Sequence, residues 1–130
     1  MTEFLLWQSV SLGGALGALA RAACLRAIAA SSGTSDDEIL LSQRRGIRLA
    51  NTLGCLALGW LSQGETETWP EGLRAALIVG VCGSLTTFST LCAQLIQTLR
   101  GPGGIRSVAW ELLLSLGFGY AALQLGFALG

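Results

Sequence analysis

Residues 83–90 place five hydroxyl side chains among eight consecutive positions. The segment lies inside an apolar run, residues 73–99, that is long enough to cross a bilayer. Because hydrocarbon cannot satisfy hydroxyl groups, these side chains must face protein, water or an ion. Gly83 followed by Thr86 and Thr87 also favours a break in the helix, and a break exposes carbonyl oxygens that can bind a cation such as Na⁺. The segment is therefore the first candidate for a functional site.

Polar residues continue along the same apolar run. Thr86, Thr90, Gln94 and Gln97 recur at spacings of four, four and three residues, which places them on one face of a helix. Such a stripe lines either an ion pathway or a polar contact between helices, and its hydroxyl groups can also bond back to carbonyls of their own helix. Phe88 lies beside the stripe. Its ring edge can contact an anion where water is scarce, although apolar packing is its ordinary role.

Further polar positions stand within the other apolar segments. Asn51 offers two N–H donors and one acceptor. Its residue type favours a hydrogen bond between helices over the alternative, a donor that faces an anion. Glu111 and Ser115 lie four residues apart, near the start of the last apolar segment. Glu111 is either a carboxylate inside the membrane, and so a functional candidate, or an interfacial residue that pairs with Arg106 or another arginine.

The composition is that of an integral membrane protein. Of 130 residues, 52% are hydrophobic and 12% are charged, and the mean hydropathy is +0.60. The length predicts one domain, residues 1–130, and favours an oligomer because so short a chain cannot enclose a large pathway. The chain has no histidine and no basic stripe, so we expect neither an enzyme nor a nucleic-acid-binding protein. The four cysteines stand singly in or beside apolar segments and are interpreted as packing residues.

Membrane-spanning helices are needed to position these residues, and four apolar segments predict four of them. They cover residues 4–28, 47–61, 73–99 and 108–129, the second being short for a span of roughly 20 residues. The expected fold is an all-α integral membrane protein with its third helix broken near the middle. Residues 31–43, with the acidic cluster 36–38, and residues 63–72 are expected to form loops. Trp69 and Pro70 suit an interfacial anchor followed by a helix start.

The arginines are distributed unevenly between the two sides that four spans define. Arg21 is left out because it lies about 25 Å along a helix from Phe4, near the far interface, where its side chain can snorkel or form a pair. The side with the first and third loops holds six arginines, and the side with the termini holds Arg74 alone. The six are Arg26, Arg44, Arg45, Arg48, Arg100 and Arg106. This bias predicts that the first and third loops lie in the cytoplasm and both termini outside the cell.

Three motifs carry a resemblance that covers nearly the whole chain. Residues 80–90 are similar to the pattern G-x-x-G-x-x-T-T-F-S-T, which is long and specific. A second pattern, G-x-x-x-x-N-x-x-G, begins at Gly46 and contains Asn51. Residues 13–18, followed by Arg21, fit a first-helix pattern whose glycines also have the spacing of closely packed helices. With these motifs and its four-span layout, the chain resembles the CrcB/Fluc fluoride channel family.

The resemblance implies antiparallel dimers with two narrow pores that pass fluoride passively out of the cytoplasm. It implies a structural Na⁺ at the dimer centre, held by backbone carbonyls that fall on Gly83 and Thr86 in this sequence. The implied pore groups are the ring of Phe88, the amide of Asn51 and the hydroxyl groups of Ser89 and Thr90. Such groups suit fluoride, because a small anion is expensive to dehydrate and needs donors and positive ring edges at close range.

The chain also departs from the family's pattern at three positions. Leu91 stands where a second phenylalanine is expected, Gln94 where a glutamate is expected, and Glu111 where a tyrosine is expected early in the fourth helix. Leucine has no aromatic edge, and an ionised Glu111 would repel fluoride. Gln94, Glu111 and Ser115 are therefore predicted only to lie next to the pore.

The arginine bias bears on the dimer that the resemblance implies. An antiparallel homodimer requires one sequence to insert in both orientations, which an excess of six arginines over one opposes. We therefore expect a dimer with an oppositely inserted paralogue that supplies missing pore groups, with a homodimer as the alternative.

Two other classes of protein are alternatives to a channel. Small multidrug-type exporters also have four helices, but they carry an essential carboxylate in the first span, and the segment between Glu3 and Arg26 contains no acid. A non-conducting accessory subunit would tolerate substitution of Asn51 or Phe88 without loss of fluoride efflux. The sequence favours the fluoride channel over both.

Overall fold

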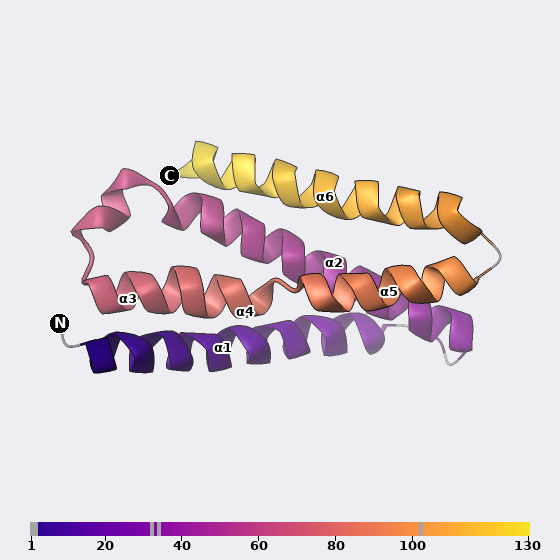
Figure 1. The fold of residues 1–130 in the computed structure, drawn as a ribbon, viewed down its shortest axis with the longest axis horizontal. Helices are drawn as coiled ribbons and strands as arrows, with labels where there is room; N and C mark the ends of the chain where they lie inside the picture. Colours follow the sequence, from indigo (N-terminus) through magenta and orange to yellow (C-terminus); the bar gives the residue numbers. More distant parts are fainter. Residues whose placement is uncertain (1–2, 32, 34, 102) are drawn as a thin grey trace.

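The computed structural model describes residues 3–31, 33, 35–101 and 103–130, and every regular element within these ranges is a helix (Figure 1). The predicted all-α class is confirmed. The long helices α1, α2 and α6 cover Glu3–Ala29, Asp36–Leu61 and Gly104–Leu129. Between α2 and α6 the chain forms a short 3-10 helix, η1 (Gly64–Thr68), and a third long helical segment. That segment comprises α3 (Glu71–Ala75), the π-helix η2 (Ala76–Cys82), α4 (Gly83–Leu85) and α5 (Phe88–Arg100).

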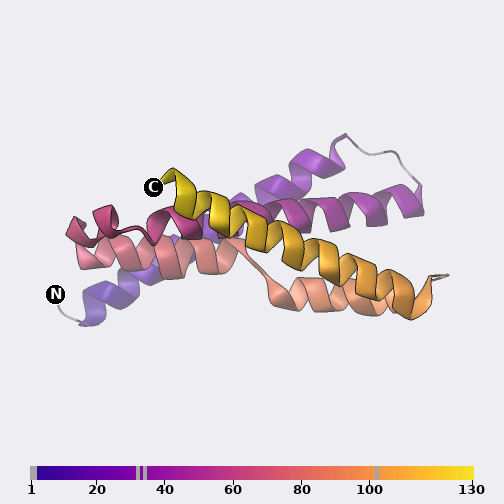
Figure 2. The same cartoon turned by 90° about the horizontal axis from the view of Figure 1, so that it is seen from above.

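The helices run antiparallel along one long axis. The start of α1, the end of α6 and η1 lie at one end of the molecule, whereas α2 and α6 both begin at the other end (Figures 1 and 2). α2 packs against both α1 and α6, α1 also packs against η2 and α4, and α5 packs mainly against α6. Figure 2 shows that α5 does not continue the line of α4 but is displaced from it after a short extended link.

Three helical segments are long and apolar enough to cross a membrane. They are α1 with 27 residues, Glu71–Arg100 with 30 and α6 with 26. Large apolar side chains point outward from them, as Leu12, Leu16 and Leu19 do on α1. Helices with satisfied backbones and an apolar exterior are suited to a lipid environment. These features are those of a multi-pass membrane protein.

α2 contains the predicted second span, residues 47–61, but it differs from the other long helices in charge. Three arginines, Arg44, Arg45 and Arg48, lie within its last 18 residues. By length and composition α2 is therefore not among the described helices that qualify as spans. Its position between α1 and α6 gives it apolar protein neighbours on both sides.

The N-terminal part of α2 corrects one prediction. Residues 31–43 were expected to form a loop, but the helix begins at Asp36; Ser32 and Thr34 of this stretch lie outside the described residues. The amide of Glu38 donates to Ser35 Oγ at 3.3 Å, and the Glu38 carboxylate accepts from Ser35 Oγ at 2.7 Å and from its amide at 3.3 Å. This is a capping box, and acidic residues in a first helical turn also interact favourably with the helix dipole. These hydrogen bonds lower the pKa of Glu38 below its ordinary value.

The connection between α2 and α3 is held by side chains. Thr66 Oγ1 donates to the carbonyl of Leu61 at 2.7 Å, which satisfies an end of α2. Trp69 packs edge-on against Trp60, with ring centroids 6.3 Å apart. The predicted helix start after Pro70 is confirmed, because α3 begins at Glu71.

Glycines permit the closest helix contacts. A Cβ added to Gly17 on α1 would collide with the carbonyl oxygen of Val81 in η2, and one added to Gly126 on α6 would collide with that of Leu56 in α2. Backbones approach this closely only where no side chain intervenes. The close packing predicted for the first helix is therefore confirmed at Gly17. The contacts also fix η2 and α4 against α1, next to the point where the third segment changes direction.

Candidate functional site

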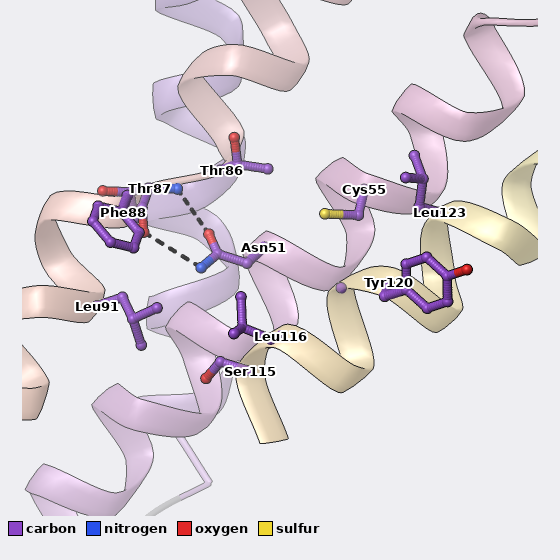
Figure 3. Close-up of a pocket in the computed structure, with 11 residues that line it drawn as sticks. Asn51, Cys55, Thr86, Thr87, Phe88, Leu91, Ser115, Leu116, Tyr120 and Leu123 are labelled. Atoms are coloured by element: carbon purple, nitrogen blue, oxygen red, sulfur yellow. Dashed lines mark hydrogen bonds between the residues drawn. The ribbon is translucent and has the colours of Figure 1, made fainter. Parts of the chain in front are cut away.

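The third helical segment is interrupted at Thr86 and Thr87. α4 ends at Leu85, Thr86 has φ −78° and ψ 146°, Thr87 has φ −147° and ψ 117°, and α5 begins at Phe88. In a continuous helix the amide of Thr87 would donate to the carbonyl of Gly83. Here it donates to Asn51 Oδ1 on α2 at 2.8 Å, and Asn51 Nδ2 lies 3.4 Å from the carbonyl oxygen of Thr87 (Figure 3). The amide side chain of one helix thus replaces part of the hydrogen-bond ladder of another.

Thr87 also caps the helix that follows. Its Oγ1 accepts from the amide of Thr90 at 3.3 Å, and in a continuous helix that amide would donate to Thr86. The same oxygen lies 3.2 Å from Ser89 Oγ and 3.0 Å from Thr90 Oγ1. The carbonyls of Gly83 and Thr86 therefore both lose the amide donor that a regular helix would give them. These are the two carbonyls that the resemblance assigned to Na⁺.

The predicted polar stripe is wrong in its first member. Thr86 precedes the interruption and Thr90 follows it, so the two do not share a helix. Thr86 Oγ1 donates back to the carbonyl of Cys82 at 2.9 Å, which is the local alternative that the sequence left open. On α5, Gln94 is buried and Gln97 is exposed, so the remaining polar residues do not form one continuous lining.

A cavity of about 390 Å³ lies beside the interruption, between α2, α5 and α6 (Figure 3). Asn51, Thr87, Phe88 and Ser115 contribute to its lining. Thr86 also lines it. The rest of its lining is largely apolar and consists of Cys55, Leu91, Leu116, Gly119, Tyr120 and Leu123. A small number of polar groups in an otherwise apolar recess is typical of a binding site for a small ligand.

The predicted pore residues are only partly brought together. Asn51 and Phe88 line the same cavity, although the side chain of Phe88 is mostly outside it, with 71% of the residue exposed. Ser89 is exposed, and Thr90 lines a different recess that is formed with α1 and α2. The hydroxyl of Thr87 connects these groups, because it contacts both Ser89 and Thr90 while its backbone bonds to Asn51.

Glu111 is buried and forms an ion pair across two helices. Its Oε1 lies 2.5 Å from Arg48 Nη2, with side-chain exposures of 12% and 24%. The partner is thus an arginine other than Arg106. Ser115 lies one turn further along α6, where it lines the cavity beside Asn51. Arg21 is partly exposed on α1.

Three residues of this region have roles that the sequence prediction did not assign to them. Thr87 was expected to take part in the break, but not to cap the next helix, although a threonine directly before an apolar run was a usable N-cap signal. Arg48 is separated from Glu111 by 63 positions, so no local rule could pair them. Tyr120 lines the cavity, and the residues around it carry no motif that marks it.

The fold and the site together define a small, all-helical membrane protein whose third helical segment opens beside a largely apolar cavity. Comparison with known proteins gives the family. Residues 8–127 match the family model described as "CrcB-like protein, Camphor Resistance (CrcB)". The chain therefore belongs to the CrcB/Fluc fluoride channel family.

Curated relatives match the chain over most of its length. The Fluoride-specific ion channel FluC of Deinococcus radiodurans is 37% identical over 134 residues, covering 98% of this chain and 97% of the relative. Fluoride-specific ion channel FluC 2 of Rhodococcus jostii is 36% identical, covering 92% of this chain and 94% of the relative. Fluoride-specific ion channel FluC of Prosthecochloris aestuarii is 35% identical, with 92% and 88% covered. The resemblance expected from the sequence motifs is confirmed.

Proposed function

We propose that this chain is a subunit of a passive, fluoride-selective channel that lets cytoplasmic fluoride leave the cell. The observation that carries the proposal is the Asn51–Thr87 contact, which holds an amide side chain at the edge of the apolar cavity beside Phe88. The names of the relatives, all fluoride-specific ion channels, point to the same ion.

The chemistry of the cavity fits a small, strongly hydrated anion. Asn51 uses its oxygen and one N–H toward Thr87, so its second N–H is available to a ligand. Ser115 adds a hydroxyl, and the ring edge of Phe88 adds a weak positive contact. Ser89 and Thr90, joined through Thr87, extend the hydroxyl groups along α5. Apolar walls strengthen each of these contacts, because little water screens them.

The carbonyls of Gly83 and Thr86 fit a structural Na⁺. Their helical amide donors are taken by Asn51 and by Thr87 Oγ1, so both oxygens are left for another partner. Unwound carbonyls within a membrane helix suit Na⁺, which prefers oxygen ligands. Two carbonyls do not fill the coordination shell of Na⁺, so a second subunit would supply further oxygens. Na⁺ at this position would hold the two interruptions together at the dimer centre. Exchange of Na⁺ for the larger K⁺ or Cs⁺ is expected to lower the thermal stability of the dimer, and equal stability in all three salts would argue against the site.

A second subunit would also cover the exposed part of the site. Phe88 is 71% exposed, Ser89 and Gly83 are exposed, and a Cβ at Gly83 would meet open space. We infer an antiparallel dimer, with an oppositely inserted paralogue favoured over a second copy because of the arginine bias. The paralogue would supply the aromatic group that Leu91 lacks. Fluoride conduction by liposomes that hold this chain alone would favour the homodimer instead.

The membrane topology follows from the same bias. We propose four transmembrane helices in the cell membrane, with residues 47–61 of α2 crossing between α1 and α6 and with both termini outside. Cysteines introduced at Gln63 and Ser107 of an otherwise cysteine-free chain test this. An impermeant thiol reagent added to intact cells should label the first and not the second, and labelling of both would indicate mixed orientation.

The alternatives make different predictions. A small multidrug-type exporter would move lipophilic cations against a proton gradient, which requires a membrane carboxylate; Glu111, the buried carboxylate of α6, is already paired with Arg48. A non-conducting accessory subunit would leave efflux unchanged when Asn51 or Phe88 is replaced.

The proposed function is tested in bacteria that lack their own fluoride exporter. Expression of this chain with its paralogue should restore growth in millimolar fluoride, and the Phe88→Ile variant, expressed at the same level, should not. If growth in fluoride requires both this chain and the paralogue but is the same with the Phe88→Ile variant, the result would support the accessory subunit. Resistance to lipophilic cations instead of fluoride would support the exporter.

A further inference from the structure

A second cavity opens at the end of the molecule where α2 and α6 begin. It measures about 720 Å³ and is lined by residues of α2, α5 and α6. Arg44, Arg106 and Glu111 contribute the charged groups, and Thr98, Ser107 and Trp110 lie among the others. Arg44 and Arg106 thus share the lining with a single carboxylate, that of Glu111, which is already paired with Arg48. The excess of positive charge favours an anion at this place.

Three helices each place one residue between, or at the border of, this second cavity and the cavity at Asn51. On α2, Arg48 lies one turn from Asn51, which lines the first cavity, and one turn from Arg44, which lines the second. On α6, Glu111 lines the second cavity and lies one turn from Ser115 in the first. The Arg48–Glu111 ion pair therefore lies between the residues that line the first cavity and those that line the second.

α5 contributes the third residue, Gln94. Leu91, Gln94 and Thr98 are its buried residues, at the spacings of one helix face. Leu91 lines the first cavity and Thr98 the second, so Gln94 lies between them. We call Arg48, Gln94 and Glu111 the neck.

The neck holds buried donors that the described part of the chain does not satisfy. Arg48 Nε and Gln94 Nε2 are both buried, and no described residue accepts a hydrogen bond from either. Gln94 as a whole is only 6% exposed. Leaving a buried N–H without an acceptor is costly, and more so for a charged group. Two such donors, each on a helix position between the two cavities and beside a cavity with an excess of arginines, indicate a place for an acceptor that carries negative charge.

We propose that the neck is a second anion-binding site, in which Arg48 and Gln94 donate to a small monovalent anion and Glu111 competes with that anion for Arg48. The proposal rests on the proposed function, because it places the site on the route between the cytoplasm and the cavity at Asn51. The competition has a consequence for flux: a site that conducts must bind well enough to admit an ion and weakly enough to release it. An unopposed, partly buried guanidinium would hold an anion too tightly, and Glu111 lowers that affinity. In this role Glu111 does not block fluoride but regulates how strongly Arg48 retains it.

The test measures anion binding at the neck separately from conduction. Trp110 lines the second cavity together with Glu111, whereas no tryptophan lines the first, so its fluorescence distinguishes an anion on the neck side from one at Asn51. A chain with Trp7, Trp60 and Trp69 changed to phenylalanine, purified with its partner, is titrated with fluoride at constant ionic strength. If that chain does not fold, the wild-type chain labelled with 5-fluorotryptophan is titrated by ¹⁹F NMR, with Trp110→Phe assigning the resonance.

Four variants separate the proposal from a structural ion pair. Glu111→Gln should lower the fluoride concentration for half-maximal response by about tenfold, since a charge-assisted hydrogen bond becomes available. Arg48→Gln and the double variant Arg48→Gln/Glu111→Gln should both lose the response, although the double variant removes the unpaired carboxylate and should fold. Arg45→Gln, which makes the same charge change on an exposed residue of α2, should respond like the wild type.

A purely structural pair predicts a different pattern. Each single substitution would then impair the protein, and the neutral double variant would recover the wild-type response, which would overturn the proposal. A wild-type Trp110 signal that does not change with fluoride would overturn it as well. If fluoride efflux is observed but the Trp110 signal does not change with fluoride, the neck proposal fails and the proposed channel function stands. If the wild type and the four variants change the Trp110 signal as predicted but no efflux occurs, the anion site stands and the channel function fails.

Discussion

Asn51 on α2 faces Thr87, the residue that directly precedes α5. The Asn51 side-chain amide contacts both the N–H and the carbonyl oxygen of Thr87, at 2.8 Å and 3.4 Å. This contact has two effects. It satisfies a backbone amide that the interrupted helix leaves free, and it fixes the orientation of the Asn51 side chain at the edge of the cavity. The same residue thus stabilises the interruption and presents a donor next to it, so the choice between a helix contact and an anion donor is not exclusive.

Asn51→Asp separates these two effects. The carboxylate can still accept from the amide of Thr87, so the fold should be retained, but the N–H donors are lost and a negative charge is added. Fluoride efflux should fall by about tenfold to a hundredfold, as expected for loss of a hydrogen bond to a charged ligand. Thr52→Val is the matched control, because the Thr52 hydroxyl only bonds back to Arg48 of its own helix. Equal fluoride efflux in both variants would mean that Asn51 does not take part in the fluoride pathway.

Thr87→Val should destabilise the start of α5. The variant loses the oxygen that accepts from the amide of Thr90, and loss of a helix cap costs about 1 kcal/mol. Thr87→Ser keeps the oxygen and should preserve stability. Unfolding of the two variants, followed by circular dichroism in detergent under increasing denaturant, measures the difference. If serine is no better than valine, the methyl group rather than the hydroxyl is what matters at this position.

Gly17→Ala should destabilise the contact between α1 and η2. The new methyl group would meet the carbonyl oxygen of Val81, and such overpacking typically costs about 1–3 kcal/mol. Gly117→Ala is the comparison, since a Cβ there meets open space and alanine favours a helix by up to about 1 kcal/mol. Thermal unfolding in detergent should show a lower midpoint for the first variant only. Similar midpoints would mean that α1 and η2 can move apart at little cost.

The start of α2 should depend on pH through Glu38. Its hydrogen bonds with Ser35 lower the pKa of the carboxyl group in the folded chain. The carboxylate therefore stabilises the first turn at pH values above the pKa of the unfolded chain, and this contribution is lost as the pH falls through the lowered pKa. Ser35→Ala should raise the pKa of Glu38 toward its ordinary value in a carboxyl ¹³C NMR titration. Ser31→Ala, which only removes a bond to Ile28, should leave the titration unchanged.

The long helices were predictable because side chains that face lipid must be apolar along the whole length of a span. The apolar runs 4–28 and 108–129 correspond closely to α1 and α6, and Pro70 marks the beginning of α3. The start of α2 was missed because the acidic residues 36–38 were interpreted as a loop. Ser35-x-x-Glu38 is nevertheless a recognisable capping box, so this error came from giving charge more weight than local hydrogen bonding.

The site was predictable in its residues but not in its arrangement. The hydroxyl-rich segment pointed to an interruption, yet a regular spacing of Thr86 and Thr90 was interpreted as one helix face. The position at which the backbone hydrogen bonds of the third helical segment stop is fixed by the contact with Asn51, a residue of another helix. The Arg48–Glu111 pair depends in the same way on how α2 packs against α6. Contacts between distant segments are set by packing, which no local pattern records.

The central claim is that this chain forms part of a fluoride-selective pathway, and ion efflux from liposomes tests it most directly. The chain is reconstituted with its oppositely inserted paralogue in liposomes loaded with equal concentrations of fluoride and chloride, and both ions are followed by selective electrodes. We predict rapid loss of fluoride, retention of chloride, and loss of fluoride efflux with Asn51→Asp. Fluoride retention equal to that of protein-free liposomes, or chloride leaving as fast as fluoride, would contradict the account.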